Sequence, residues 1–169
     1  LSDIYEKDKR FEFIAGLDIG YRDETAFVVL ATDSEKFYAI DEYISKEGTT
    51  SAHAENIQEL IDRWGIEAIF IDSAAQQTKA DLAYDYDIYC DNALKSVNDG
   101  IASIQVLVDM ERIEFDVNRC RHTYSSLSSY RWNHRTETQK PLHDWSSHCS
   151  DAIRYAVYSY QRTRVSVYA

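Results

Sequence analysis

Cysteine, proline and glycine are scarce in this chain of 169 residues, which has 3, 1 and 5 of them respectively. The cysteines, Cys90, Cys120 and Cys149, lie far apart and form no Cys-x-x-Cys pair. This spacing excludes a disulfide-rich scaffold and predicts a reduced, cytosolic setting. With Pro141 as the one proline there is little linker material inside the chain, so we expect one domain of ordinary size.

Long apolar runs are missing as well. No stretch approaches the ~20 residues of a membrane span, and no signal peptide opens the sequence. Residues 1–10 are polar and charged, which predicts a linker from a missing upstream domain, followed by the folded domain at 11–169. The sequence contains no Gly-x-x-x-x-Gly-Lys-Ser/Thr loop, so we expect no ATP hydrolysis by this fragment.

Positive charge is scarce overall, but not in the last third of the chain. The 29 acidic and 18 basic residues give a net charge of −11, which at first argues against nucleic acid, since phosphate binding needs Lys and Arg. Residues 1–118 hold 26 acidic and 10 basic residues, whereas residues 119–169 hold 3 and 8. This asymmetry indicates one basic working face on an otherwise acidic protein.

Hydrophobic periodicity predicts an α/β domain built on a mixed sheet, in which three antiparallel strands are followed by parallel ones. Apolar or alternating runs predict strands at 11–17, 25–31, 36–45, 68–71, 87–90 and 112–115. Helical spacing predicts helices at 51–63, 76–84, around 101–108, 119–128 and 146–161. The polar, basic and aromatic segment 130–142 is typical of a hairpin or a loop.

Three aspartates fall where chemistry is expected. Asp18 ends the first strand, Asp72 ends the apolar run 69–71, and Asp151 lies early in the last predicted helix. Each has an ordinary alternative: a turn before Gly20, a strand-end or helix-cap residue, and a solvent-facing helical residue. Together they would form a cluster of like charges, which is costly unless cations neutralise it. Carboxylates select Mg²⁺ or Mn²⁺, and two such ions can hydrolyse a phosphodiester.

The order of these acids and their neighbours resembles a known family. The motifs are Gly16-x-Asp18-x-Gly20, Ile71-Asp72-Ser73-Ala74, Tyr130-x-Trp132, Pro141 and His148-x-x-Asp151-Ala152-x-Arg154-Tyr155. They are similar to the C-terminal nuclease domain of large terminase subunits from tailed bacteriophages, in the RNase H-like superfamily. A polar residue, often Glu, is usual shortly before the Tyr-x-Trp element. This chain has Leu127-Ser128-Ser129 there, which puts an acidic contribution from that point in doubt.

The resemblance implies an RNase H-like fold with a central mixed sheet of the five-stranded type, flanked by helices. It implies Asp18, Asp72 and Asp151 as catalytic metal ligands for two Mg²⁺ or Mn²⁺ ions, with Asp18 bridging both. His148, one helical turn before Asp151, is a further candidate ligand, with a partly buried structural histidine as the alternative. Asp144 is another candidate, and an N-cap role is its alternative.

The basic residues of the last third are candidate contacts to DNA. Those interleaved with aromatic residues are Arg119, Arg121, Arg131, Arg135 and Lys140. They could line a track for the phosphate backbone, and an unspecialised basic surface is the alternative.

The resemblance therefore predicts a metal-dependent endonuclease that cuts concatemeric double-stranded viral DNA during genome packaging in the host cell cytoplasm. Its partners would be DNA, an upstream ATPase domain of the same protein, the terminase small subunit and the portal protein. Three alternatives stay open at this point. They are another RNase H-like nuclease of the resolvase or transposase type, an actin-like or sugar-kinase-like phosphotransferase, and a non-catalytic docking module on the same scaffold.

Overall fold

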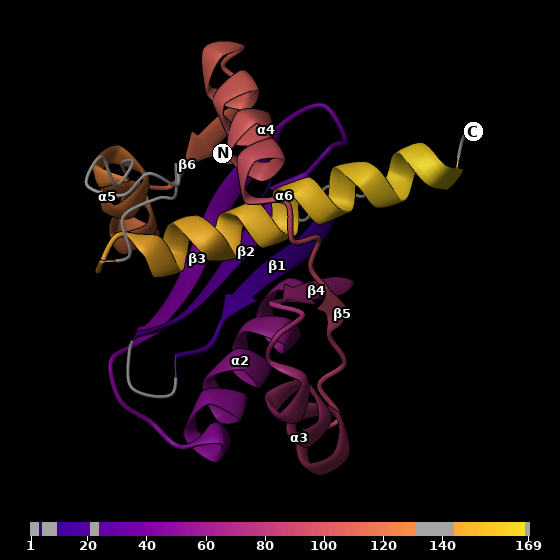
Figure 1. Ribbon diagram of the computed structural model, residues 1–169, viewed down its shortest axis with the longest axis vertical. Helices are drawn as coiled ribbons and strands as arrows, with labels where there is room; N and C mark the ends of the chain where they lie inside the picture. Colours follow the sequence, from indigo (N-terminus) through magenta and orange to yellow (C-terminus); the bar gives the residue numbers. More distant parts are fainter. Residues whose placement is uncertain (1–3, 5–9, 21–23, 131–143, 168–169) are drawn as a thin grey trace.

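The computed structural model describes residues 4, 10–20, 24–130 and 144–167 (Figure 1). Its strands are β1 (Glu12–Asp18), β2 (Thr25–Thr32), β3 (Phe37–Ser45), β4 (Ala68–Ile71), β5 (Asp91–Asn92) and β6 (Ile113–Phe115). Its helices are α2 (Thr50–Trp64), α3 (Gln76–Tyr86), α4 (Val97–Asp109), α5 (Arg121–Ser129) and α6 (Ser147–Val167). No helix in this part of the chain is both long and apolar enough to cross a membrane.

The strands form one sheet in the order β5-β4-β1-β2-β3-β6. β1, β2 and β3 pair antiparallel, whereas β4 is parallel to β1, β5 to β4 and β6 to β3. The predicted succession of antiparallel and then parallel strands is confirmed. Over the described residues the sheet has six strands, and the strand predicted at 112–115 forms β6 at the edge of β3.

One predicted strand is displaced along the chain. The expected strand at 87–90 lies instead at Asp91–Asn92. Asp87 adopts a left-handed conformation (φ 56°) that ends α3, and the amide of Ile88 still bonds back to the carbonyl of Leu82 at 3.0 Å. The chain is thus closing the helix where the apolar residues suggested a strand. The segment 131–142 of the predicted hairpin or loop lies outside the described residues.

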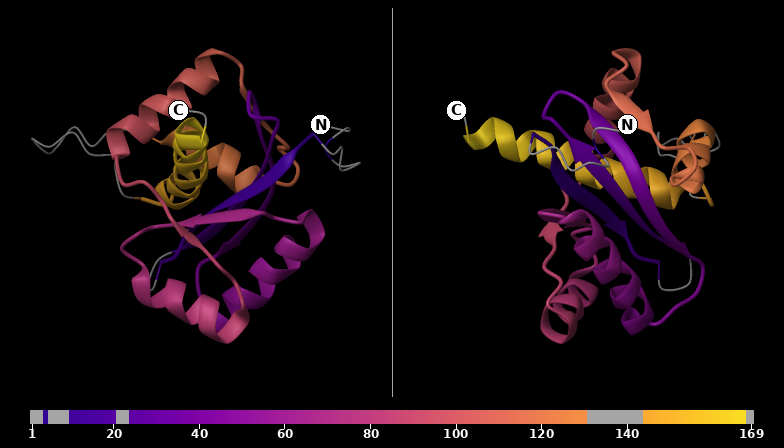
Figure 2. Two further views of the ribbon diagram at one scale, coloured as in Figure 1. Left: turned by 90° about the vertical axis from the view of Figure 1, so that its right-hand side faces the viewer. Right: turned by 180° about the vertical axis from the view of Figure 1, so that it is seen from behind.

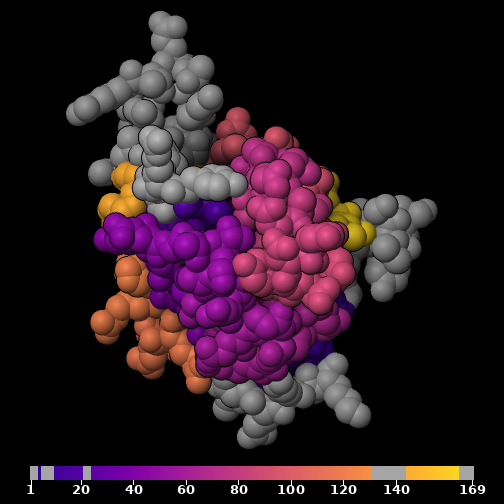
Figure 3. Space-filling view, turned by 90° about the horizontal axis from the view of Figure 1, so that it is seen from below, coloured from indigo at the N-terminus to yellow at the C-terminus, as the bar shows by residue number. Residues whose placement is uncertain are grey.

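Alternation along the strands divides the core into two layers. Phe13, Ala15 and Leu17 of β1 pack with α2 and α3, whereas Ile14 packs with α4 and α6. Figure 2 shows the sheet between these two groups of helices, and Figure 3 shows α2 and α3 side by side over one face. The sheet is therefore buried on both faces, which explains why β2 is buried along its whole length.

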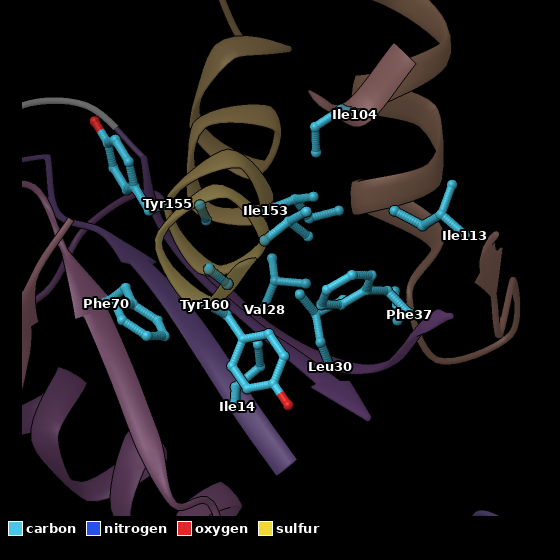
Figure 4. Packing of buried hydrophobic residues seen from close by; sticks show 14 of the residues in the cluster. Ile14, Val28, Leu30, Phe37, Phe70, Ile104, Ile113, Ile153, Tyr155 and Tyr160 are labelled. Atoms are coloured by element: carbon cyan, nitrogen blue, oxygen red, sulfur yellow. The ribbon is translucent and has the colours of Figure 1, made fainter. Parts of the chain in front are cut away.

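The last helix lies directly on the central strand. A Cβ atom added to Gly16 would fall 1.7 Å from the carbonyl oxygen of Ala152, so the backbones meet where only glycine fits. In the second half of α6 the Tyr160 hydroxyl donates to Glu12 at 2.8 Å, and in its first turn His148 reaches Asp18. Between these points Ile153 joins the core over β1, β2 and β3 (Figure 4).

Candidate metal centre

Two of the predicted acids lie next to each other at the carboxyl edge of the sheet. β1 and β4 pair in parallel with Gly16 opposite Phe70 and Leu17 opposite Ile71, so Asp18 and Asp72 follow as the next register pair. Neighbouring parallel strands are ~4.8 Å apart. Both acids share the strand face of Phe70, which packs on the α6 side. The sequence pattern of an apolar run ending in Asp therefore located both residues.

Asp18 is held by the first turn of α6. His148 Nδ1 and Oδ2 of Asp18 share a hydrogen bond of 2.8 Å, and the two side chains are only 9% and 17% exposed. Burial raises the pKa of Asp18 above its usual range, and the nearby charges of Asp151 and Asp72 raise it further, against the lowering effect of the His148 bond. Negative charges therefore converge on Asp18, which is the condition that a bound cation relieves.

Asp151 comes from α6 and carries its own partners. Its Oδ1 atom accepts from Arg154 Nε at 3.2 Å, from Arg154 Nη2 at 2.9 Å and from the Tyr130 hydroxyl at 3.3 Å. The Asp151 side chain is 21% exposed and that of Arg154 is 6% exposed. All three contacts use one carboxylate oxygen, which leaves Oδ2 without a partner among the described residues.

Tyr155 lies beside the same acids, one helical turn after Asp151. Burial raises the pKa of its hydroxyl, and the charges of Asp18, Asp151 and Asp72 raise that pKa further. Figure 4 shows this hydroxyl pointing away from the apolar cluster. The motifs contain Tyr155, Arg154 and Tyr130 but predict no role in the site for them. The helical spacing of Asp151 and Tyr155 was the one signal that placed a further side chain on the site's face of α6.

Asp144 organises the start of α6. Its Oδ1 accepts from the backbone amide of Ser146 at 2.9 Å and from the Ser146 hydroxyl at 2.6 Å, while its carbonyl accepts from the amide of Ser147 at 3.0 Å. These bonds correspond to the capping alternative. A role for Asp144 as a metal ligand stays a prediction.

The basic candidates are spread unevenly over the structure. Arg119 Nη1 lies 3.4 Å from Oδ2 of Asp41, an acid that is 7% exposed. Arg119 also borders a hollow of about 370 Å³ together with Glu24 and Glu42, so acids and bases are mixed there. Arg121 is exposed at the start of α5. Arg131, Arg135 and Lys140 lie outside the described residues, and the DNA track stays a prediction.

The donor set determines which ion could be held. Within the part of the chain that the structure describes, no three His, Cys, Asp or Glu side chains are arranged to hold one ion by themselves. Mg²⁺ takes one or two carboxylates and completes its shell with water and substrate phosphates. The adjacent oxygen donors of Asp18 and Asp72, with Asp151 near enough to raise the pKa of Asp18, fit such a hard cation.

Comparison with known structures first defines the class of fold. The nuclease domain of the bacteriophage SPP1 large terminase, solved with bound Mn, superposes with a TM-score of 0.70 at 21% identity, covering 90% of this chain and 86% of that one. The nuclease domain of the P22 large terminase gives 0.73 at 19% identity, covering 92% and 84%. The chain thus has the fold of these two large-terminase nuclease domains, which is the fold that the resemblance implied.

Comparison of sequences then gives the family. The family model described as "Terminase RNaseH-like domain" matches residues 15–159. The large terminase subunit of Escherichia phage T5 is 39% identical over 165 residues, which is 94% of this chain and 37% of that protein. The chain therefore belongs to the terminase RNaseH-like domain family, as the resemblance implied. It spans little more than a third of this curated relative.

Proposed function

We propose that this chain is a metal-dependent endonuclease that cuts concatemeric double-stranded viral DNA during genome packaging. The observation that carries the proposal is the adjacent register of Asp18 and Asp72 at one sheet edge, with Asp151 brought to Asp18 by α6. Membership of the terminase family favours this substrate over those of resolvases and transposases. The SPP1 relative solved with bound Mn supports the use of a divalent cation.

The proposed chemistry assigns a role to each acid. Asp18, Asp72 and Asp151 would together hold two Mg²⁺ or Mn²⁺ ions, with Asp18 at the centre of the three acids. Such ions, when bound, activate a water and stabilise the leaving oxygen of a phosphodiester. His148 holds the Asp18 carboxylate through Oδ2, which fixes its orientation and leaves Oδ1 for a cation. The buried packing of α6 against β1 keeps the three carboxylates and His148 fixed in position.

The remaining parts of the proposal concern the larger assembly. Residues 1–10 would link an upstream ATPase domain to the nuclease domain at 11–169, and that ATPase domain would supply the ATP hydrolysis for which this chain has no phosphate-binding loop. The T5 relative has room for such a domain, since this chain covers 37% of it. The small subunit and portal would be partners, and the host cytoplasm the place of action.

Plasmid nicking tests the proposed function. We expect nicking with Mn²⁺ or Mg²⁺, none with EDTA, and a loss of about 10²-fold or more in Asp18→Asn, Asp72→Asn and Asp151→Asn, because each removes an anionic ligand while keeping the side-chain shape. Asp62→Asn is the matched control, since Asp62 is exposed on α2 beneath the opposite face of the sheet. Wild-type nicking by all three site variants would disprove the assignment.

A further inference from the structure

Arg154 is a buried cation inside the candidate metal centre. Its side chain is 6% exposed, and its guanidinium contacts Asp151 through two of its three nitrogens. The third, Nη1, is buried with no acceptor among the described residues, and Arg154 and Ser150 both line a cavity of about 360 Å³. The polar interactions of Arg154 are therefore directed at Asp151.

The stem of Arg154 is confined by its neighbours. A Cβ atom on Gly100 of α4 would lie 2.7 Å from Cγ and 2.8 Å from Cδ of Arg154. The guanidinium carbon lies 4.7 Å from the ring centroid of Tyr155. Packing on both sides therefore limits the rotamers that Arg154 can adopt, and α4 takes part in fixing its position.

This confinement determines how Asp151 is oriented. Two nitrogens of a rigid, planar group meet one oxygen of the carboxylate, and the Tyr130 hydroxyl meets the same oxygen. The carboxylate can then turn only by breaking three contacts. Because Oδ1 is saturated and Oδ2 is not, one oxygen remains for a cation.

We infer that Arg154 is a positioning residue for the candidate metal centre: backed by Gly100, its guanidinium holds Asp151 by one oxygen and presents the other to a divalent cation. The inference rests on the proposed function, since it assumes that Asp151 is a metal ligand. An opposite role is physically conceivable, because a cation beside a ligand also repels Mg²⁺ or Mn²⁺. The two roles predict opposite changes in metal affinity.

Direct Mn²⁺ binding, measured by electron paramagnetic resonance on the DNA-free chain, separates the two. We expect Arg154→Met to weaken binding about 10-fold or more, the usual effect of losing a partner that orients a ligand. Arg154→Lys should be weakened as well, because a single ammonium cannot reproduce the planar two-nitrogen contact. Unchanged or tighter binding by Arg154→Met, or wild-type binding by Arg154→Lys, would overturn the inference.

Gly100→Ala provides a second variant that leaves every charged group in place. Its Cβ atom must displace the Arg154 stem, so we expect weaker Mn²⁺ binding in a chain whose circular dichroism is that of the wild type. A folded Gly100→Ala chain with wild-type Mn²⁺ affinity would contradict the inference, even if Arg154→Met failed to fold.

Two further variants complete the experiment. Arg162→Met is the matched control, because Arg162 is exposed on the same helix and also lies against a tyrosine ring, that of Tyr158, at 5.4 Å. Its Mn²⁺ affinity should be unchanged, and a loss equal to that of Arg154→Met would overturn the positioning role. Asp18→Asn separates failure of the proposed function from failure of the Arg154 inference. Wild-type Mn²⁺ binding by Asp18→Asn refutes the proposed function. Loss of binding by Asp18→Asn, together with wild-type binding by the Arg154 variants, refutes only the Arg154 inference.

Discussion

Substituting Gly16 by alanine tests the contact that places α6 over β1. The new Cβ atom would lie 1.7 Å from the carbonyl oxygen of Ala152, whereas carbon–oxygen contacts in proteins are rarely closer than about 3.3 Å. The two backbones must therefore separate by roughly 1.6 Å at this point, which is the difference between those distances. Neither atom is the end of a flexible side chain, so the strain cannot be relieved by a rotamer change.

The expected cost follows from this geometry. Overpacking of a core commonly costs about 1–3 kcal/mol, and a collision between two backbones inside the core that α6 forms with the sheet belongs at or above the upper end. About 3 kcal/mol corresponds to a fall in Tm of roughly 6–12 °C for a chain of this size. The same displacement would separate His148 from Asp18, now 2.8 Å apart, and so weaken Mn²⁺ binding.

Denaturant titration followed by circular dichroism measures this loss, and a second glycine calibrates it. Gly65 has a positive φ of 67° but nothing within 4 Å of an added Cβ atom, so Gly65→Ala should cost only the backbone strain of about 1–2 kcal/mol. Equal or smaller destabilisation by Gly16→Ala than by Gly65→Ala would refute the argument that close approach, rather than conformation, requires glycine at position 16.

Two other predictions concern thiols and DNA. Burial raises the pKa of Cys90 and of Cys149 to about 12 and that of Cys120 further. A disulfide reagent at about pH 8 should therefore label no thiol until the chain unfolds. Rapid labelling of the native chain would contradict the buried placement of the three thiols. The net charge of −11 predicts weak DNA binding that falls steeply with salt, and Arg121→Ala should reduce the slope of log affinity against log salt by about one if this exposed residue contacts a phosphate. An unchanged slope in a fluorescence-anisotropy titration would remove Arg121 from the DNA track.

The sequence was sufficient to predict those features that depend on local order. Asp18 and Asp72 each follow an apolar run, and parallel strands end at one edge, so their common location could be predicted from the pattern alone. The position of β5 could not be predicted from the pattern, because the left-handed turn at Asp87 depends on how α3 ends rather than on the apolar residues after it. The strand at 112–115 was predicted correctly, but its position beside β3 depends on a crossover that brings residues 113–115 to that edge.

The partners of the acids were beyond sequence reasoning for a different reason. That Arg154 contacts Asp151 and packs against Gly100 depends on the rotation of α6 about its axis and on the distance between α6 and α4. Both are set by the Gly16–Ala152 contact and by the core around Ile153. A motif can show that Arg154 belongs with Asp151, but not that its other neighbour is a helix some fifty residues earlier in the chain.

The placement of α6 determines how the candidate site is lost when the protein opens locally. This one helix supplies His148, Asp151 and Arg154 to the site, and along the same turns it supplies Ile153 and Val157 to the core. Local opening of a protein proceeds in cooperative units set by buried contacts, and here the acids and the core belong to one unit with β1. A local opening that lifts α6 from β1 would therefore remove His148, Asp151 and Arg154 from the site together, although Asp18 lies more than a hundred positions earlier in the chain.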